Sequence, residues 1–221
     1  MVDTQAAPSM GMGTPESASV ATSSVYVVIP MRKGSKGCPG KALRTFRSST
    51  LLECAVSDAL LLTDRVIVTT DYAESDMPMA ARPFYQRRPD HLCRDDSPMT
   101  LVLKHAAQSM YPSDTILLIQ PNCYHSDRVR LAKRVLAEKA AGTSVRYPDF
   151  WHPAYAIGHK RMPPTRQGLE PVYRPDGLLY RMKVASLMLI DPFKGPYIPV
   201  EGTANVDTES DWTALNERYG L

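Results

Sequence analysis

Four basic side chains lie close together in the loop that follows the first apolar run of the chain, "VYVVIPMRKGSKGCPGKAL" (residues 25–43). Like charges packed this closely repel one another unless an anion lies among them. The glycines of the loop allow successive backbone N–H groups to turn toward one anion. The pattern therefore favours a phosphate-binding loop, and a solvated basic turn is the alternative. The four cations are Arg32, Lys33, Lys36 and Lys41.

This loop is not a Walker A motif, which requires G-x-x-x-x-G-K-[ST]. The span from Gly34 to Gly40 is one residue too long, and Ala42 follows the lysine. Arg32 can still make paired hydrogen bonds to phosphate oxygens, while lysines act as movable point charges. The residues thus predict a polyanion site of another kind.

Short apolar runs alternate with helical patterns along the rest of the chain. β-Branched runs separated by helices are typical of a parallel sheet covered on both faces. Ligands of such sheets bind outside the carboxyl ends of the strands, which is where the basic loop lies. The predicted strands are 25–30, 65–70, 115–120 and 143–147, and the predicted helices are 49–62, 97–110, 126–141 and 209–219.

The composition indicates one globular domain in a cytoplasmic protein. A chain of 221 residues suits one sizeable core, and a net charge of +3 makes no case for nucleic-acid or membrane-surface binding. No apolar run approaches the about 18 residues that span a membrane. The four cysteines are widely spaced without a CxxC pair, which predicts free thiols.

Two segments depart from this alternating pattern. Residues 1–24 contain no Lys or Arg and are rich in small residues, which predicts a disordered tail rather than a targeting peptide. Prolines recur from about 148 to 205, where the apolar segments are short. We expect an inserted arm there, within a single domain over residues 25–221, that packs on a partner subunit.

The order of residues in the basic loop resembles the signature I-P-A-R-x-G-S-K-x-x-P-x-K-N of cytidylyltransferases that activate acidic sugars. Five further elements are similar to that family in the same order, so the resemblance spans residues 25–218. They are "VIVTTDY", "RRPDHLCRDDSPM", "LLIQP", "TRQGLEPVYRPDGLLY" and "NVDTESDW". The chain is identified as similar to the CMP-N-acylneuraminate synthetase-like family. The resemblance implies a Rossmann-like three-layer α/β nucleotidyltransferase fold, a mostly parallel sheet, an inserted dimerisation arm and a homodimer.

The resemblance also implies that a hydroxyl of an acidic acceptor attacks the α-phosphate of CTP and releases pyrophosphate. Mg²⁺ is the implied cofactor, with Asp207 as a ligand and Asn205 standing where the family has a second aspartate. A neutral amide oxygen is a weaker magnesium ligand than a carboxylate. Asp211 has an alternative role as a favourable charge at the start of the last helix. The implied catalytic residues are Arg32, Lys36, Lys41 and Asp207, and the implied nucleotide-binding residues are Arg32, Lys33, Gly34, Ser35, Lys36, Lys41, Arg88 and Asp95.

The acceptor side departs most from the family. The chain reads "QPNCYHSDR" where the family has Q-P-T-S-P-L-R, and a carboxylate at Asp176 replaces an amide. The acceptor is therefore either a nonulosonate or a phosphonate, and a non-catalytic nucleotide-binding paralogue is a further alternative. A sugar-nucleotide glycosyltransferase would leave the basic loop unexplained. The implied acceptor-binding residues are Gln120, Arg166, Gln167, Asp176, Tyr180 and Phe193, of which Tyr180 and Phe193 have a core role as the alternative.

Overall fold

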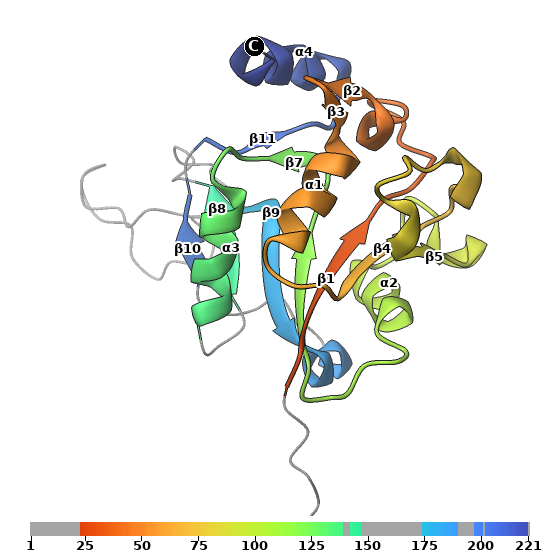
Figure 1. The fold of residues 1–221 in the computed structure, drawn as a ribbon, viewed down its shortest axis with the longest axis vertical. Helices are drawn as coiled ribbons and strands as arrows, with labels where there is room; N and C mark the ends of the chain where they lie inside the picture. The colour runs from red at the N-terminus through yellow and green to blue at the C-terminus, as the bar shows by residue number, and fades with distance from the viewer. Residues whose placement is uncertain (1–22, 139–141, 147–173, 190–196, 201, 221) are drawn as a thin grey trace, which may run out of the picture.

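The computed structural model describes residues 23–138, 142–146, 174–189, 197–200 and 202–220 (Figure 1). Most of the tail and of the inserted arm that the sequence predicts lie outside these residues. So do three predicted acceptor-binding residues, Arg166, Gln167 and Phe193. Ser24, in the predicted tail, donates its backbone N–H to Asp114 Oδ1 at 2.8 Å.

The centre of the fold is a seven-stranded sheet with the strand order β10-β8-β9-β6-β1-β4-β5. Every neighbouring pair is parallel except those of β9, which runs antiparallel to both β6 and β8. The predicted mostly parallel α/β sheet is thus confirmed. The strands are β1 (Val25–Pro30), β4 (Val66–Thr70), β5 (Tyr85–Arg87), β6 (Thr115–Ile119), β8 (Gly142–Arg146), β9 (Arg174–Lys183) and β10 (Tyr197–Pro199).

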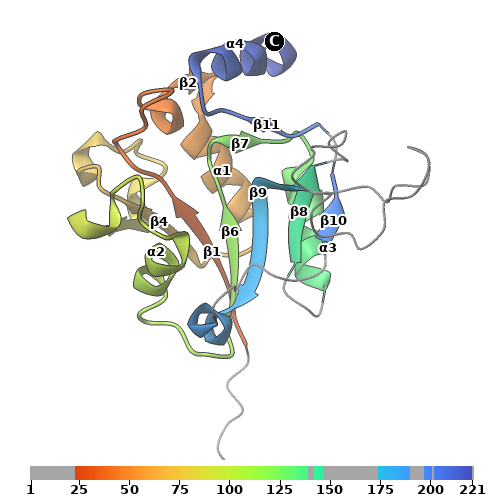
Figure 2. The ribbon, with the colours of Figure 1, turned by 180° about the vertical axis from the view of Figure 1, so that it is seen from behind.

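Helices cover both faces of this sheet, which gives three layers. Helices α1 (Leu51–Leu60) and α3 (Arg128–Ala137) lie on one face, as Figure 1 shows. Helix α2 (Met99–Ala106) and the short η7 (Val184–Met188) cover the opposite face, seen in Figure 2. Burial on both faces explains the continuous apolar sequence of β1, where Val27, Val28 and Ile29 are fully buried.

A smaller layer lies beyond the carboxyl ends of β1 and β6. It contains α4 (Glu209–Tyr219) and two antiparallel strand pairs, β2 (Thr45–Phe46) with β3 (Ser49–Thr50), and β7 (Cys123–Tyr124) with β11 (Ala204–Asn205). The rings of Phe46, Tyr124 and Tyr219 pack edge to face at 4.9 and 5.1 Å. This layer brings the last part of the chain beside the loop that follows β1. Single turns complete the connections: η1 (Lys41–Leu43), η2 (Glu74–Asp76), η3 (Arg82–Phe84) and η4 (Asp90–Leu92).

The four strands and four helices that the pattern predicts are all present, most with shorter ends. The sequence pattern missed β9, because Pro175 and Gly177 interrupt its apolar alternation. The four cysteines are free thiols, as expected. Within the described residues, no helix has the length and apolar character that crossing a bilayer requires.

Candidate functional site

The basic loop begins directly at the carboxyl end of β1, in the middle of the sheet. The N–H of Met31 extends the pairing with β4 by donating to the Thr69 carbonyl at 3.1 Å. The N–H of Lys33 then donates to Asp71 Oδ1 at 2.7 Å. The loop ends at Gly40, whose left-handed φ of 65° precedes the turn η1. Both ends of the loop are therefore fixed, and its cations lie over the edge where parallel-sheet ligands bind.

Two cations of the loop converge on one carboxylate. Arg32 forms an ion pair with Asp95, and Lys36 Nζ lies 2.6 Å from the other oxygen of the same carboxylate. The hydrogen bonds from Lys36 and Arg32 hold the pKa of Asp95 below its usual value. The anion between these two cations is therefore the carboxylate of Asp95, a side chain of the protein itself.

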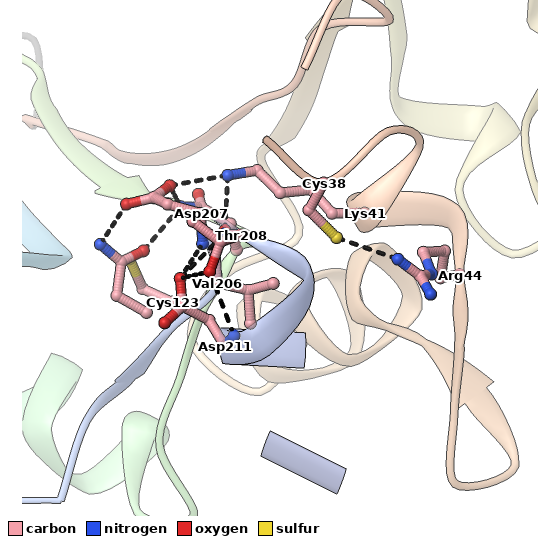
Figure 3. Close-up of polar contacts among 10 residues, drawn as sticks. Cys38, Lys41, Arg44, Cys123, Val206, Asp207, Thr208 and Asp211 are labelled. Atoms are coloured by element: carbon pink, nitrogen blue, oxygen red, sulfur yellow. Dashed lines mark hydrogen bonds and ion pairs between the residues drawn. The ribbon is translucent and has the colours of Figure 1, made fainter. Parts of the chain in front are cut away.

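Lys41 links the loop to the last part of the chain, as Figure 3 shows. Its ammonium donates to the Val206 carbonyl at 2.5 Å and to Asp207 Oδ1 at 2.8 Å. Gly37 lies so close to the same segment that an added Cβ would overlap the backbone oxygen of Asp207. Arg44 makes a further link, because it bonds to both Cys38 Sγ (3.0 Å) and Glu209.

Asp207 offers an exposed carboxylate of the kind that magnesium binds. Its side chain is 60% exposed, and magnesium is usually held by one or two carboxylates plus phosphate oxygens. Asn205 lies beside it, but the Asn205 amide donates to Asp207 Oδ2 at 2.8 Å while its own oxygen accepts from Asn122 at 2.9 Å. In the described part of the chain, no group of three or more His, Cys, Asp or Glu side chains is placed to hold a metal.

Asp211 belongs to the start of α4. It forms a capping box with Thr208: its carboxylate accepts from the Thr208 N–H at 2.8 Å, and the Thr208 hydroxyl accepts from the Asp211 N–H. Burial alone would raise the pKa of Asp211, but hydrogen bonds from the Asp207 and Thr208 backbones and the Thr208 hydroxyl lower it below its ordinary value. The structural role expected for Asp211 is confirmed.

Arg88 is a buried cation with an unused donor. It follows β5 and is only 3% exposed. Its guanidinium donates to the Thr69 carbonyl at 2.7 Å, while its Nε has no hydrogen-bond partner. Burial lowers the pKa of Arg88, and the nearby positive charge of Arg32 acts in the same direction. A buried, unsatisfied donor costs free energy unless a ligand satisfies it.

The loop also contains Lys33, Gly34 and Ser35, which the sequence predicts to bind the nucleotide. Lys33 is directed toward β4, since its ammonium lies 4.0 Å from Asp76 and 5.7 Å from the centre of the Tyr72 ring. Gly34 is exposed and Ser35 is half-buried. The structure therefore brings Arg32, Lys36 and Asp95 together and directs the Lys33 side chain toward the β4 side of the loop.

The predicted acceptor residues within the described chain lie around β9. A Cβ added at Gly177, next to Asp176, would lie 3.6 Å from Gln120 Oε1 and 2.9 Å from Cys123 Sγ. The start of β9 therefore approaches Gln120 at the carboxyl end of β6. Tyr180 pairs with Leu118 and packs against the core beneath α2.

Asn122 is a site residue that the sequence comparison did not single out. It follows the Gln120–Pro121 pair at the end of β6, and its Nδ2 lies 2.9 Å from Asn205 Oδ1 and 3.5 Å from Asp207 Oδ1. The feature of the sequence that could have identified Asn122 is its position directly after a central strand. Its partners, 83 and 85 residues away, cannot be identified from spacing.

Solved structures share this fold at low sequence identity. The CMP:2-keto-3-deoxy-manno-octonic acid synthetase complexed with CTP superposes with a TM-score of 0.63 at 15% identity, covering 89% of this chain and 98% of that chain. The 4-diphosphocytidyl-2C-methyl-D-erythritol synthase from Anaerococcus prevotii superposes with a TM-score of 0.58 at 12% identity, covering 89% of this chain and 96% of that chain. A cytidylyltransferase from Leptospira borgpetersenii superposes with a TM-score of 0.52 at 16% identity, covering 87% of this chain and 85% of that chain. No curated protein sequence matches the chain.

Sequence comparison provides the assignment that fold similarity alone does not. The cytidylyltransferase family profile matches residues 26–185, which include the basic loop, Arg88, Asp95 and Gln120. The match covers well over half of the chain. The chain therefore belongs to the cytidylyltransferase family and is an enzyme of the nucleotidyltransferase type.

Proposed function

We propose that this enzyme transfers CMP from CTP to a hydroxyl of an acidic, sialic-acid-like nonulosonate and releases pyrophosphate. The observation that carries the proposal is the convergence of Arg32 and Lys36 on the single carboxylate of Asp95. Two cations arranged around one anion at the carboxyl end of β1 suit a phosphate group that displaces that carboxylate.

In the proposed reaction the acceptor hydroxyl loses its proton to solvent and its oxygen forms a bond to the α-phosphorus, while the bond from that phosphorus to the bridging oxygen breaks and pyrophosphate leaves. Such transfers depend on positioning and charge neutralisation more than on covalent catalysis. Arg32, Lys36 and Lys41 hold the triphosphate and neutralise the charge of the departing pyrophosphate. Gly34, Ser35 and Lys33 complete the nucleotide site through the loop backbone and at its rim.

Arg88 is proposed to contact the nucleotide base. Its buried Nε is a donor without a protein partner, and the cytosine ring offers acceptor atoms at O2 and N3. Asp95 lies in the same segment and is released from Arg32 and Lys36 when phosphate replaces it.

Magnesium, when bound, supplies positive charge to the phosphate oxygens. Asp207 is the proposed protein ligand. Its carboxylate is held by Lys41 on the side of the basic loop, so a metal bound here lies next to the triphosphate site. The neighbouring Asn205 was the second ligand that the sequence predicted.

Gln120, Asp176 and Tyr180, with Arg166, Gln167 and Phe193, are the proposed acceptor-binding residues. The similar synthetase acts on 2-keto-3-deoxy-manno-octonic acid, which is an acidic keto sugar, and this supports an acceptor of the same chemical class. An arginine such as Arg166 pairs well with a carboxylate. We also propose a homodimer, in which the arm that carries Arg166 reaches the partner's site, and a cytoplasmic location, which free thiols support.

The test is to incubate the protein with CTP and Mg²⁺ and a panel of nonulosonates and phosphonates, and to measure pyrophosphate release and CMP conjugates. We expect a conjugate with a nonulosonate. Turnover with phosphonates alone would mean that the acceptor is a phosphonate and not a nonulosonate. CTP binding without turnover on any acceptor would favour the non-catalytic paralogue.

A further inference from the structure

We infer that Asn122 and Asn205 are positioning residues that orient the carboxylate of Asp207, and that Asn205 acts on Asp207 as a hydrogen-bond donor rather than as a metal ligand. The inference rests on the proposed function, because Asp207 is the proposed magnesium ligand. It assigns a role to Asn122 and changes the role predicted for Asn205.

The three side chains form a continuous chain of hydrogen bonds. Asn122 Nδ2 donates to Asn205 Oδ1 at 2.9 Å, and Asn205 Nδ2 donates to Asp207 Oδ2 at 2.8 Å. The other oxygen of Asp207 accepts from Lys41 Nζ at 2.8 Å. Figure 3 shows the Lys41 ammonium against one oxygen of Asp207. Both carboxylate oxygens therefore have a fixed donor, which restricts rotation of the side chain.

The donor and acceptor pattern fixes the direction of the Asn205 amide. Its oxygen lies near two donors, Asn122 Nδ2 and the thiol of Cys123 at 3.3 Å. If the amide were turned around, its NH₂ group would face these donors and its oxygen would face the Asp207 carboxylate. That arrangement would place donors against donors and acceptors against acceptors.

The backbone keeps the two asparagines next to each other. Asn205 pairs with Cys123 in the β7–β11 ladder, and the Val206 N–H donates to the Asn122 carbonyl at 2.9 Å. The amide pair is therefore built on paired strands rather than on independent loops. Since the Asn205 oxygen already accepts hydrogen bonds within the protein, Asp207 rather than Asn205 is the member of this pair that offers oxygen lone pairs to an incoming metal.

The experiment measures Mn²⁺ binding to the CTP-loaded protein by electron paramagnetic resonance. The variants are Asn122→Ala, Asn205→Ala and the double variant, with Asn216→Ala on α4 as a matched control. Removing a residue that orients a metal ligand typically weakens metal affinity by about 10- to 100-fold, and the lower value suits a site that phosphates also complete. We expect each single variant to weaken Mn²⁺ binding by about tenfold, the double variant to lose no more than either single one, and the control to be unchanged.

Two further readouts separate positioning from general damage. The affinity for CTP without metal and the thermal midpoint are expected to stay near the wild-type values. Independently of metal, the side-chain amide resonances of Asn205, assigned by their loss in Asn205→Ala, are expected to shift in both Asn122→Ala and Asp207→Ala.

Several outcomes would overturn the inference. An effect of Asn205→Ala without one of Asn122→Ala, or losses that multiply to about a hundredfold in the double variant, would make Asn205 an independent ligand. Normal metal binding in both single variants would remove the positioning role. A wild-type protein that binds neither CTP nor Mn²⁺ would contradict the proposed function itself, and unshifted Asn205 resonances would contradict only the inference.

Discussion

Individual side chains in the basic loop have contrasting surroundings. Lys36 is 85% exposed at its side chain, whereas the side chain of Lys41 is only 15% exposed. Lys41 is thus part of the folded structure as well as of the site. Lys36 contributes little to folding and is the better probe of phosphate binding.

Lys36→Ala is expected to lower kcat/KM for CTP by about 10- to 100-fold, because a hydrogen bond to a charged group contributes about 1.5–3 kcal/mol. The thermal midpoint should barely change. Steady-state kinetics at varied CTP checks this, with Lys133→Ala on the outer side of α3 as the control. Wild-type turnover in Lys36→Ala would mean that the assignment of the basic loop to phosphate binding is wrong.

Asp95 provides a pH prediction. Its pKa is lowered by Lys36 and Arg32, so its folded value lies below the about 3.9 of an unfolded aspartate. The ion pairs therefore stabilise the loop above about pH 4 and lose that contribution as the pH falls through the folded pKa. A carboxyl NMR titration should place Asp95 at a higher pH in Lys36→Ala than in the wild type. An unchanged titration would mean that the ion pair is not formed in solution.

At the scale of secondary-structure elements, the sequence predicts what depends on local patterns. The β-branched runs of β1, β4 and β6 are buried on both faces, so their continuous apolar character identifies them. Three-residue edge strands such as β5 and β10 carry too few residues for a pattern. The long strand β9 is also missed, because only its pairing with β6 and β8 shows that the residues around Pro175 and Gly177 are extended.

The candidate site could likewise be predicted only where it depends on local residue order. Residue order identified the basic loop and Asp207, and the structure places them in contact. The hydrogen bond from Lys41 to the Val206 carbonyl joins residues 165 positions apart, and no local pattern encodes it. The hydrogen bond between Asn122 and Asn205 could not be predicted either, because the two residues are far apart in the sequence.

The capping box of α4 gives a prediction for this element. Thr208→Ala removes the hydroxyl that accepts from the Asp211 N–H, and this change is expected to lower the free energy of unfolding by about 1 kcal/mol. Urea denaturation measures it. Thr208→Ser keeps the hydroxyl and should stay close to wild type. Equal losses in both variants would mean that the methyl group, not the cap, is responsible.

Across the whole molecule, the site joins segments from opposite parts of the chain. The loop after β1 packs directly on the segment before α4, and a Cβ added at Gly37 would overlap the Asp207 backbone. The buried cluster beneath this contact draws Cys38 and Phe46 from the first part of the chain, and Val206 and Leu215 from the last.

Gly37→Ala tests that contact. The added methyl would overlap the backbone oxygen of Asp207, and such overpacking costs about 1–3 kcal/mol. We expect lower stability in urea denaturation together with weaker metal-dependent turnover. Gly34→Ala is the matched control for stability, since its Cβ would lie 3.8 Å from the nearest side-chain atom. Equal stability of the two variants would mean that the loop can move away from Asp207.

The long separation between Lys41 and Asp207 also has a consequence for how the protein comes to be active. Closing a loop of 166 residues costs more chain entropy than pairing neighbouring strands, so contacts of this kind form late in folding. During synthesis, β1, β4 and β6 leave the ribosome well before Asp207. A nascent chain can therefore pair β1 with β4 and β6 while the proposed metal ligand is still missing, and the site is complete only after the last part of the chain has been made.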